Sequence, residues 1–238
     1  MSIGKSPVEL MDRLGYRFSD ITYLQNAVTH SSFANERRAR GMLLPSNERL
    51  EFLGDAVLQI LISEYLYERF FDKGEGNLTK IRQHLVCEKT LAAIATELRV
   101  GDYLNVGRGE ELTDCRRRPK VLADALEAII AAIYIDSNKF STAVAREAVL
   151  ALFKSAIENS QNMQKGDYKT LLQQLVEKDG SAVLEYVVVA EDGPEHEKSF
   201  TVEARVNNNV VGTGTSSTKK DAEQQAAKMA LALFGVSV

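Results

Sequence analysis

The sequence predicts a mainly helical N-terminal part followed by a small α+β unit, and three observations support this fold class. Apolar residues recur at helical spacing through most of residues 8–157. A polar, aperiodic and glycine-terminated stretch follows at residues 158–166. Beyond it the period changes, and residues 199–206 alternate strictly between apolar and polar. We therefore expect a first domain over residues 1–158, a linker over 159–166 and a second domain over 167–238.

Helices of the first domain are expected, in chain order, at residues 8–14, 48–70, 79–98, 121–135 and 143–157. Loops are expected between them at residues 41–45, 72–77 and 107–119. Pro45 and Ser46 mark the entry to the longest helix, with Ser46 as its N-cap. Gly54, inside that helix, costs up to about 1 kcal/mol relative to alanine. Close packing against another helix or a metal site would explain it; the alternative is a glycine that the helix merely tolerates.

The second domain is expected to open and close with a helix and to hold three strands between them. The helices are predicted at residues 167–178 and 221–234, and the strands at 184–190, 199–206 and 210–214. Asn207, Asn208 and Asn209 form the turn between the last two strands. The order α-β-β-β-α describes a small α+β domain.

Composition restricts the class of protein. The chain has 238 residues, of which 45% are hydrophobic and 26% charged, and its net charge is −4. Its apolar runs are shorter than the ~20 residues of a membrane span, and its start lacks a signal-peptide core. Cys87 and Cys115 form no Cys-x-x-Cys pair, and with three scattered histidines they offer no zinc-ligand spacing. We expect a soluble cytoplasmic protein with reduced thiols and no membrane partner.

Two of the predicted helices carry pairs of carboxylates in otherwise apolar stretches. Glu51 and Asp55 share one face, as do Asp124 and Glu127. Like charges at this spacing repel, and buried charges are costly unless something compensates them. Acids on helices usually face solvent, but these stretches have too few polar neighbours to form a solvated face. A divalent cation such as Mg²⁺ would supply the compensation.

The residues around these acids resemble a known family. The stretch NERLEFLGDAVL at residues 47–58 resembles the signature of the ribonuclease III endonuclease domain. The similarity extends to residues 23–34 and 122–132. It implies that the four acids bind metal and that Asp55 and Glu127 are essential to the chemistry.

Two further acids, Glu48 and Glu75, match family positions associated with substrate handling near the scissile strand. Glu48 could equally be a first-turn acid favoured by the helix dipole, and Glu75 a plain loop residue. His30 and His84 are expected to be packing or hydrogen-bonding residues, because a metal-based hydrolysis needs no histidine base. The run at residues 116–118 is either an RNA contact or a solvated loop.

The C-terminal part resembles a double-stranded RNA-binding domain. The matching motifs are DYKTLLQ at residues 167–173, GPEH at 193–196, Gly-x-Gly at 212–214 and KKxAE at 219–223. The resemblance implies that RNA is contacted by Thr170, Gln173, His196, Lys219 and Lys220. Residues 167–238 nevertheless hold 7 Lys and Arg against 11 Asp and Glu, so recognition would rest on a local basic patch. The loop before the lysines is slightly longer than the commonest form of the motif.

Together the two resemblances cover nearly the whole chain, in the order found in bacterial ribonuclease III. They imply a homodimeric endoribonuclease that cleaves double-stranded RNA with Mg²⁺, for which Mn²⁺ could substitute. Its products would carry 5′-phosphate and 3′-hydroxyl ends, and its substrates would be ribosomal, messenger and other structured precursor RNAs. One alternative is a non-catalytic double-stranded RNA-binding adaptor, which would be expected to have lost an acid. Another is a phosphohydrolase of small nucleotides, which would need no RNA-binding domain.

Overall fold

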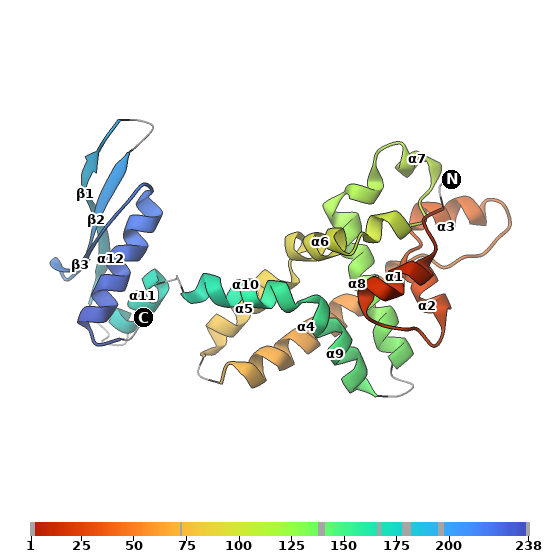
Figure 1. Cartoon of the computed structure of the whole chain (residues 1–238), viewed down its shortest axis with the longest axis horizontal. Coiled ribbons are helices and arrows are strands. Elements are labelled where there is room, and N and C mark those ends of the chain that lie inside the picture. The colour runs from red at the N-terminus through yellow and green to blue at the C-terminus, as the bar shows by residue number, and fades with distance from the viewer. Residues whose placement is uncertain are drawn as a thin grey trace. The chain divides into compact units, whose positions relative to one another are not determined.

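The chain divides into two compact units, Met1–Ser160 and Gln161–Val238, each of which is described by itself (Figure 1). The computed structural model describes residues 3–71, 73–137, 141–165, 168–177, 182–194 and 198–236. Its described residues form helices in the first unit, and a three-stranded sheet with helices in the second. The expected fold class, mainly α followed by a small α+β domain, is confirmed.

The first unit contains helices of very different lengths joined by short turns. In chain order they are α1 (Pro7–Leu14), α2 (Ile21–Ala27), α3 (Ser31–Arg38), α4 (Glu48–Arg69), α5 (Glu75–Val86), α6 (Glu88–Glu97), α7 (Arg108–Glu111), α8 (Pro119–Ser137) and α9 (Thr142–Leu152). Two 3₁₀ helices, η1 (Val100–Tyr103) and η2 (Cys115–Arg117), precede α8. Helix α10 (Lys154–Lys165) begins in this unit.

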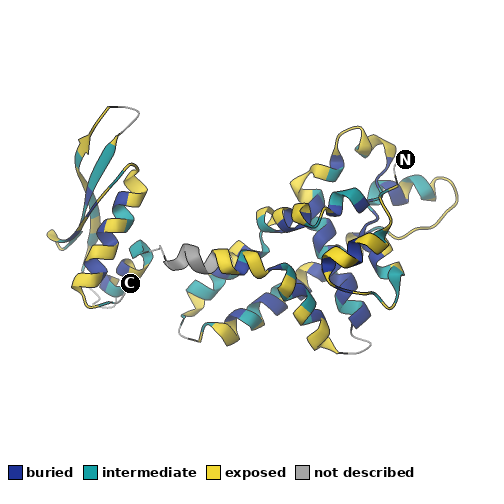
Figure 2. Cartoon of the chain, viewed as in Figure 1, coloured by how far each residue is buried: buried dark blue, intermediate teal, exposed yellow. Residues whose placement is uncertain are grey.

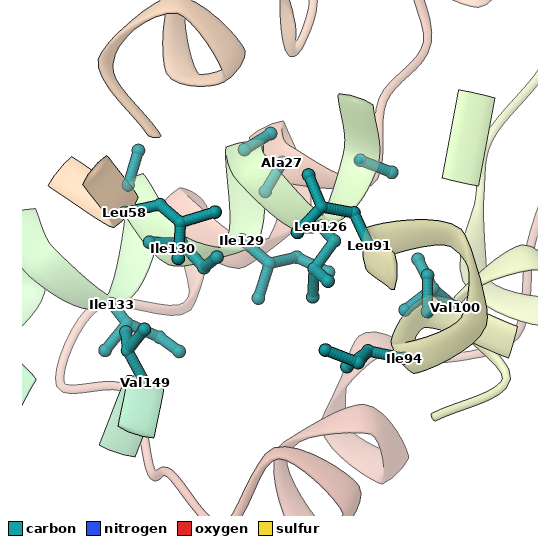
Figure 3. Close-up of a cluster of buried hydrophobic side chains, with 14 of the residues drawn as sticks. Ala27, Leu58, Leu91, Ile94, Val100, Leu126, Ile129, Ile130, Ile133 and Val149 are labelled. Atoms are coloured by element: carbon teal, nitrogen blue, oxygen red, sulfur yellow. The ribbon is translucent and has the colours of Figure 1, made fainter. Parts of the chain in front are cut away.

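Helix α8 forms the centre of the first unit's hydrophobic core. Figure 3 shows its Leu126, Ile129, Ile130 and Ile133 gathered with Leu58 of α4, Leu91 and Ile94 of α6 and Val149 of α9. The side chains of Leu126, Ile129 and Ile130 are fully buried. Asp124 and Glu127 on the same helix are only half-buried. The core therefore fixes α8 tightly and leaves its two acids at the margin.

Gly54 brings α4 into close contact with α8, as its position predicts. A Cβ atom added at Gly54 would lie 1.9 Å from the carbonyl oxygen of Glu127. No side chain fits at that separation, so glycine is required for the two backbones to approach this closely. The contact joins the two acid-bearing helices directly.

Three expected boundaries differ in the structure. The single helix expected over residues 79–98 is two helices, because Cys87 is extended (φ −74°, ψ 153°) and opens α6 as its N-cap. The helix expected over 143–157 divides at Phe153. Ser46 is not the N-cap of α4: Asn47 occupies that place, and the Ser46 hydroxyl instead donates to Glu48 Oε2 at 2.8 Å. Helical periodicity does not reveal a one-residue break, because the apolar spacing continues across it.

The stretch expected to be a linker, residues 159–166, is helical as far as Lys165. Its glutamine, methionine and lysine residues are good helix formers, so a polar composition does not prevent a helix that continues from a packed neighbour. The preceding side chains Phe153 and Ile157 are buried in the first unit's core.

The second unit comprises α11 (Tyr168–Glu177), β1 (Leu184–Asp192), β2 (Ser199–Val206), β3 (Asn209–Ser216) and α12 (Lys219–Leu233). The strands form an antiparallel sheet in the order β1-β2-β3. Helix α12 packs its small residues Ala222, Ala226, Ala227 and Ala230 inward, and its buried and exposed residues alternate along the helix (Figure 2). The small side chains let the helix lie close to the sheet.

Strand β3 lies at the edge of this sheet and is covered by side chains of α12. The backbone N–H of Thr213 donates to Met229 Sδ at 3.4 Å, and that of Thr215 donates to Gln225 Oε1 at 3.3 Å. A Cβ added at Gly212 or Gly214 would lie 2.2 Å from a carbonyl oxygen of α12. The two glycines therefore allow the helix to lie directly on the edge strand.

A buried carboxylate ties the N-terminal segment to the end of α8. Asp136, fully buried, accepts hydrogen bonds from the Tyr16 hydroxyl at 2.9 Å and from the backbone N–H groups of Ser19 and Asp20 at 2.8 and 3.0 Å. Burial and this carboxylate raise the pKa of the Tyr16 hydroxyl.

Among the described helices, none combines the length and the hydropathy that crossing a membrane requires.

Candidate functional site

Three of the four predicted acids converge on one place between α4 and α8. Glu51, Asp124 and Glu127 each offer a carboxylate oxygen, and these oxygens all lie within 4.8 Å of one another. Glu51 comes from the first turn of α4, and the other two acids lie one turn apart near the start of α8. The contact at Gly54 sets this geometry, because it brings the Glu127 backbone against α4.

Lys120 compensates only part of the negative charge of the cluster. Burial, followed by the neighbouring carboxylates of Asp55, Asp124 and Glu51, raises the pKa of Glu127 to about 7. Burial and the charge of Asp124 also raise the pKa of Glu51. Burial raises the pKa of Asp124, although the ammonium group of Lys120 opposes this. Carboxylates that resist ionisation together are those that a bound cation would stabilise.

The donor set fits a hard divalent cation. Mg²⁺ prefers oxygen ligands at about 2.0–2.1 Å and is usually held by a few carboxylates together with water. Three half-buried carboxylate oxygens within 4.8 Å of one another can converge on one such ion. The described cysteines are not part of the cluster, which argues against a soft-metal site.

Asp55, the fourth predicted acid, is close to the cluster without being part of it. Its charge is the largest carboxylate contribution to the raised pKa of Glu127. Its side chain is exposed and accepts a hydrogen bond from Gln59 Nε2 at 3.3 Å on the same helix. The sequence periodicity placed Asp55 on the same helical face as Glu51, but the structure brings only Glu51 within ligand distance of the α8 acids.

Two residues beside the cluster are absent from the sequence prediction. Lys120 Nζ lies 3.5 Å from Asp124 Oδ2, and the charge of Asp124 raises the pKa of Lys120. Glu88, the first residue of α6, is near enough for its charge to raise the pKa of Asp124. The spacing of Lys120, four residues before Asp124, would have indicated a shared face. Nothing local in the sequence indicates Glu88, which reaches the site through tertiary packing.

His30 is a hydrogen-bonding residue, as expected. Its Nδ1 accepts from the backbone N–H of Ser32 at 3.3 Å, which caps α3. When protonated, the ring would oppose the rise in the pKa of Asp124, so it lies within electrostatic reach of the acid cluster.

The acids expected to handle substrate lie outside the cluster. Glu48, exposed at the start of α4, accepts from Ser46, and its charge contributes to the raised pKa of Glu51. Glu75 is the first residue of α5 rather than a loop residue, and it accepts from the Thr79 hydroxyl at 2.8 Å. The structure therefore places Glu48 next to the site.

The arginine run before α8 is mainly structural. Arg116 donates to the carbonyl oxygens of Gly101 and Leu104 and pairs with Glu111 at 2.9 Å. Arg118 pairs with Glu110 at 3.1 Å. Arg117 pairs with Asp114 at 3.7 Å and is 85% exposed, so the run combines structural contacts with an exposed guanidinium group.

Four of the five predicted RNA contacts of the second unit lie on two helices. Thr170 and Gln173 are one turn apart on α11, where Gln173 is exposed and donates to Glu177 Oε1 at 2.8 Å. Lys219 and Lys220 are exposed at the start of α12, whose N-cap is Thr218. His196 lies outside the described residues.

Helix α4 also exposes an apolar stripe. Phe52, Ile60 and Tyr67 are 83%, 62% and 76% exposed. They lie at helical spacing on one side of α4, and Phe71 just beyond the helix is 91% exposed. An apolar surface of this kind usually marks an interface.

Comparisons with known proteins agree with these features. A family model described as "Ribonuclease-III-like" matches residues 20–157, and one described as "Double-stranded RNA binding motif" matches residues 168–233. Ribonuclease 3 of Natranaerobius thermophilus is 46% identical over 223 residues, covering 94% of each chain. Ribonuclease 3 of Clostridium tetani is 42% identical over 224 residues, covering 94% of this chain and 92% of its own.

A solved structure resembles the first unit. The nuclease domain of ribonuclease III from Campylobacter jejuni superimposes with a TM-score of 0.56 at 39% identity, covering 63% of this chain and 97% of its own. Its description refers to flexibility in a region involved in dimer formation. This likeness, the family matches over both units and the acid cluster between α4 and α8 agree. The chain belongs to the ribonuclease III family of endoribonucleases.

Proposed function

We propose that this protein is a Mg²⁺-dependent endoribonuclease that hydrolyses phosphodiester bonds in double-stranded RNA. The observation that carries the proposal is the convergence of three carboxylate oxygens within 4.8 Å on a chain that also has a double-stranded RNA binding motif. The products would carry 5′-phosphate and 3′-hydroxyl ends. Ribosomal, messenger and other structured precursor RNAs are the proposed substrates.

In this proposal Glu51, Asp124 and Glu127 hold the cation, and Asp55 joins them when substrate is bound. When bound, Mg²⁺ supplies a more acidic water and stabilises charge on the leaving oxygen. The pKa of Glu127 is raised to about 7 without metal, and cation binding would lower it because the cation stabilises the ionised carboxylate. Mn²⁺, which also favours oxygen ligands, could replace Mg²⁺. Glu48 lies beside the cluster and could orient the scissile strand, with Glu75 in a more distant supporting role.

RNA would be held by the second unit, through Thr170, Gln173, His196, Lys219 and Lys220. A motif of this class reads the shape of the duplex and its 2′-hydroxyl groups rather than its sequence. The proposed domains are residues 1–158 and 167–238 with a connecting segment at 159–166. The division of the structure after Ser160 and the ends of the two family matches support these bounds.

The active form is proposed to be a homodimer. The exposed stripe of Phe52, Ile60 and Tyr67 supports this, because a second copy would cover apolar area that is otherwise in water. A two-fold axis suits a duplex, whose antiparallel strands have the same local symmetry. The free thiols Cys87 and Cys115 support a reducing cytoplasmic location.

The decisive experiment incubates the purified protein with a long RNA duplex, with Mg²⁺ or with a chelator. We expect cleavage in the sample with Mg²⁺ and none in the sample with chelator. Equal degradation in both samples, or none in either, would reject the proposal. Glu127→Gln should abolish cleavage and retain duplex binding, whereas Glu147→Gln, at an exposed position on α9, should retain both.

The same experiment separates the alternatives. A non-catalytic adaptor would bind the duplex and never cut it, and a small-nucleotide phosphohydrolase would not bind it.

For the dimer, Phe52→Glu should shift the sedimentation coefficient from that of a dimer to that of a monomer. An unchanged value would exclude the α4 stripe as the interface.

A further inference from the structure

One carboxylate of the second unit is paired with two lysines at once. Glu191 lies near the end of β1, and its Oε1 accepts a hydrogen bond from Lys219 Nζ at 2.7 Å. Its Oε2 forms an ion pair with Lys198 Nζ at 3.7 Å. The hydrogen bond from Lys219, and then the charges of both lysines, lower the pKa of Glu191. Lys219 is also one of the two lysines at the start of α12 that the RNA-binding motif presents.

The pairing sets the direction of the Lys219 side chain. Its ammonium group lies 5.1 Å from the centre of the Phe200 ring on β2, in addition to its contact with Glu191 on β1. Lys219 is thus turned toward the strands, although its side chain is still 54% exposed. Lys220, next along the chain, is exposed as well.

This arrangement does little to stabilise the fold. The Glu191 side chain is 40% exposed, and ion pairs in water at this level of exposure contribute little to stability. A lysine in the first turn of a helix is also unfavourably placed in the helix dipole. The ammonium group of Lys219 attracts an anion, and in the free protein that anion is Glu191.

We propose that Glu191 occupies the place of an RNA phosphate at Lys219 and thereby restrains the affinity of the protein for double-stranded RNA. The inference rests on the proposed function of this unit as a duplex-binding module. RNA must displace the carboxylate from Lys219 or bind without that lysine, and in both cases Glu191 remains beside the phosphate backbone as a like charge. The acidic balance of residues 167–238, with 11 acids to 7 basic residues, makes each free lysine important.

The test is duplex binding by the full chain carrying Glu191→Gln. Binding is measured by fluorescence anisotropy in chelator, so that no cleavage occurs, on a duplex longer than the about 16 base pairs that such a motif spans. The variant should bind about two- to five-fold more tightly, the range expected for loss of an exposed ion pair. Glu185→Gln removes the same charge from the same strand, about 20 Å away, and should leave the affinity nearly unchanged.

A double-mutant cycle with Lys219→Ala shows whether the effect passes through this lysine. Lys219→Ala should weaken binding only slightly in the wild-type background and should remove the whole gain in the Glu191→Gln background. If Glu191 instead held Lys219 in its binding position, Glu191→Gln would weaken binding as Lys219→Ala does. Weaker or unchanged binding by Glu191→Gln would therefore overturn the proposal.

The outcomes also separate this inference from the proposed function. Wild-type protein that does not bind the duplex would reject the function of the second unit, and the inference with it. Wild-type binding with equal gains from Glu191→Gln and Glu185→Gln would leave the function intact and reject the specific role of Glu191. Thermal unfolding of each variant checks that the exposed substitutions leave the fold unchanged.

Discussion

Replacing Gly54 by alanine sets two physical effects against each other. Helix propensity alone predicts a gain, because alanine is about 1 kcal/mol better than glycine inside a helix. The structure predicts a loss, because the new Cβ would lie 1.9 Å from the carbonyl oxygen of Glu127, where ordinary contact begins at 3.4 Å. The helices α4 and α8 would have to separate by about 1.5 Å, and overpacking of this kind costs about 1–3 kcal/mol.

The same displacement should affect the acid cluster more than the fold. The new Cβ would clash with the backbone carbonyl oxygen of Glu127 itself. The Glu127 carboxylate would therefore move relative to Glu51 on α4. A shift of about 1 Å in a catalytic group can cost about 10²-fold in rate. We expect Gly54→Ala to bind Mg²⁺ more weakly in calorimetry and to cleave duplex RNA about 100-fold more slowly, with an unfolding midpoint below that of the wild type.

Gly109→Ala provides the matched control. Gly109 lies in the short helix α7, and a Cβ added there meets no atom within 4 Å. This variant should keep wild-type stability, Mg²⁺ affinity and cleavage rate. If Gly54→Ala were as stable and as active as Gly109→Ala, the close contact between α4 and α8 would not position the site, and the reasoning would be refuted.

Three further outcomes can be measured without RNA. The pKa of Glu127 is raised from 4.5 to about 7, so its ionised form is disfavoured in the folded state; its contribution to stability is complete below pH 4.5 and is lost as the pH rises to about 7. Urea unfolding of wild type and Glu127→Gln should therefore diverge over that range, and parallel curves would contradict the raised pKa. Lys120→Met removes an ammonium group 3.5 Å from Asp124; Mg²⁺ should then bind about two- to five-fold more tightly in calorimetry, and weaker binding would show that Lys120 supports the site. Asp136→Asn retains one acceptor oxygen for two backbone donors and the Tyr16 hydroxyl, and should lower the free energy of unfolding by about 1–3 kcal/mol; an unchanged midpoint in urea would contradict this.

Much of the fold could be predicted because the sequence patterns are strong locally. The alternation in β2 and the long apolar period of α4 and α8 correspond to elements found within a few residues of their expected bounds. The break at Cys87 was missed because one extended residue does not disturb the apolar spacing on either side. The helix over the expected linker was missed because its polar residues are compatible with both a helix and an irregular linker.

The candidate site was predictable in its residues and less so in its geometry. Spacing along each helix identified both acid pairs, but it cannot give the rotation of one helix against the other. The contact at Gly54 fixes that rotation, and it brings Glu51 rather than Asp55 within reach of Asp124 and Glu127. For the same reason Glu88 on α6 could not be found from the sequence.

The covered edge of the small sheet bears on how this protein behaves at high concentration. An open edge strand offers unpaired backbone groups to any other extended chain, which is a common start of aggregation. In β3 the N–H groups of Thr213 and Thr215 are instead bonded to Met229 and Gln225. At β3 the sheet therefore resists growth by strand addition, whereas β1 forms its other edge. Met229→Ala together with Gln225→Ala would reopen the edge, at a cost to solubility before any cost to catalysis.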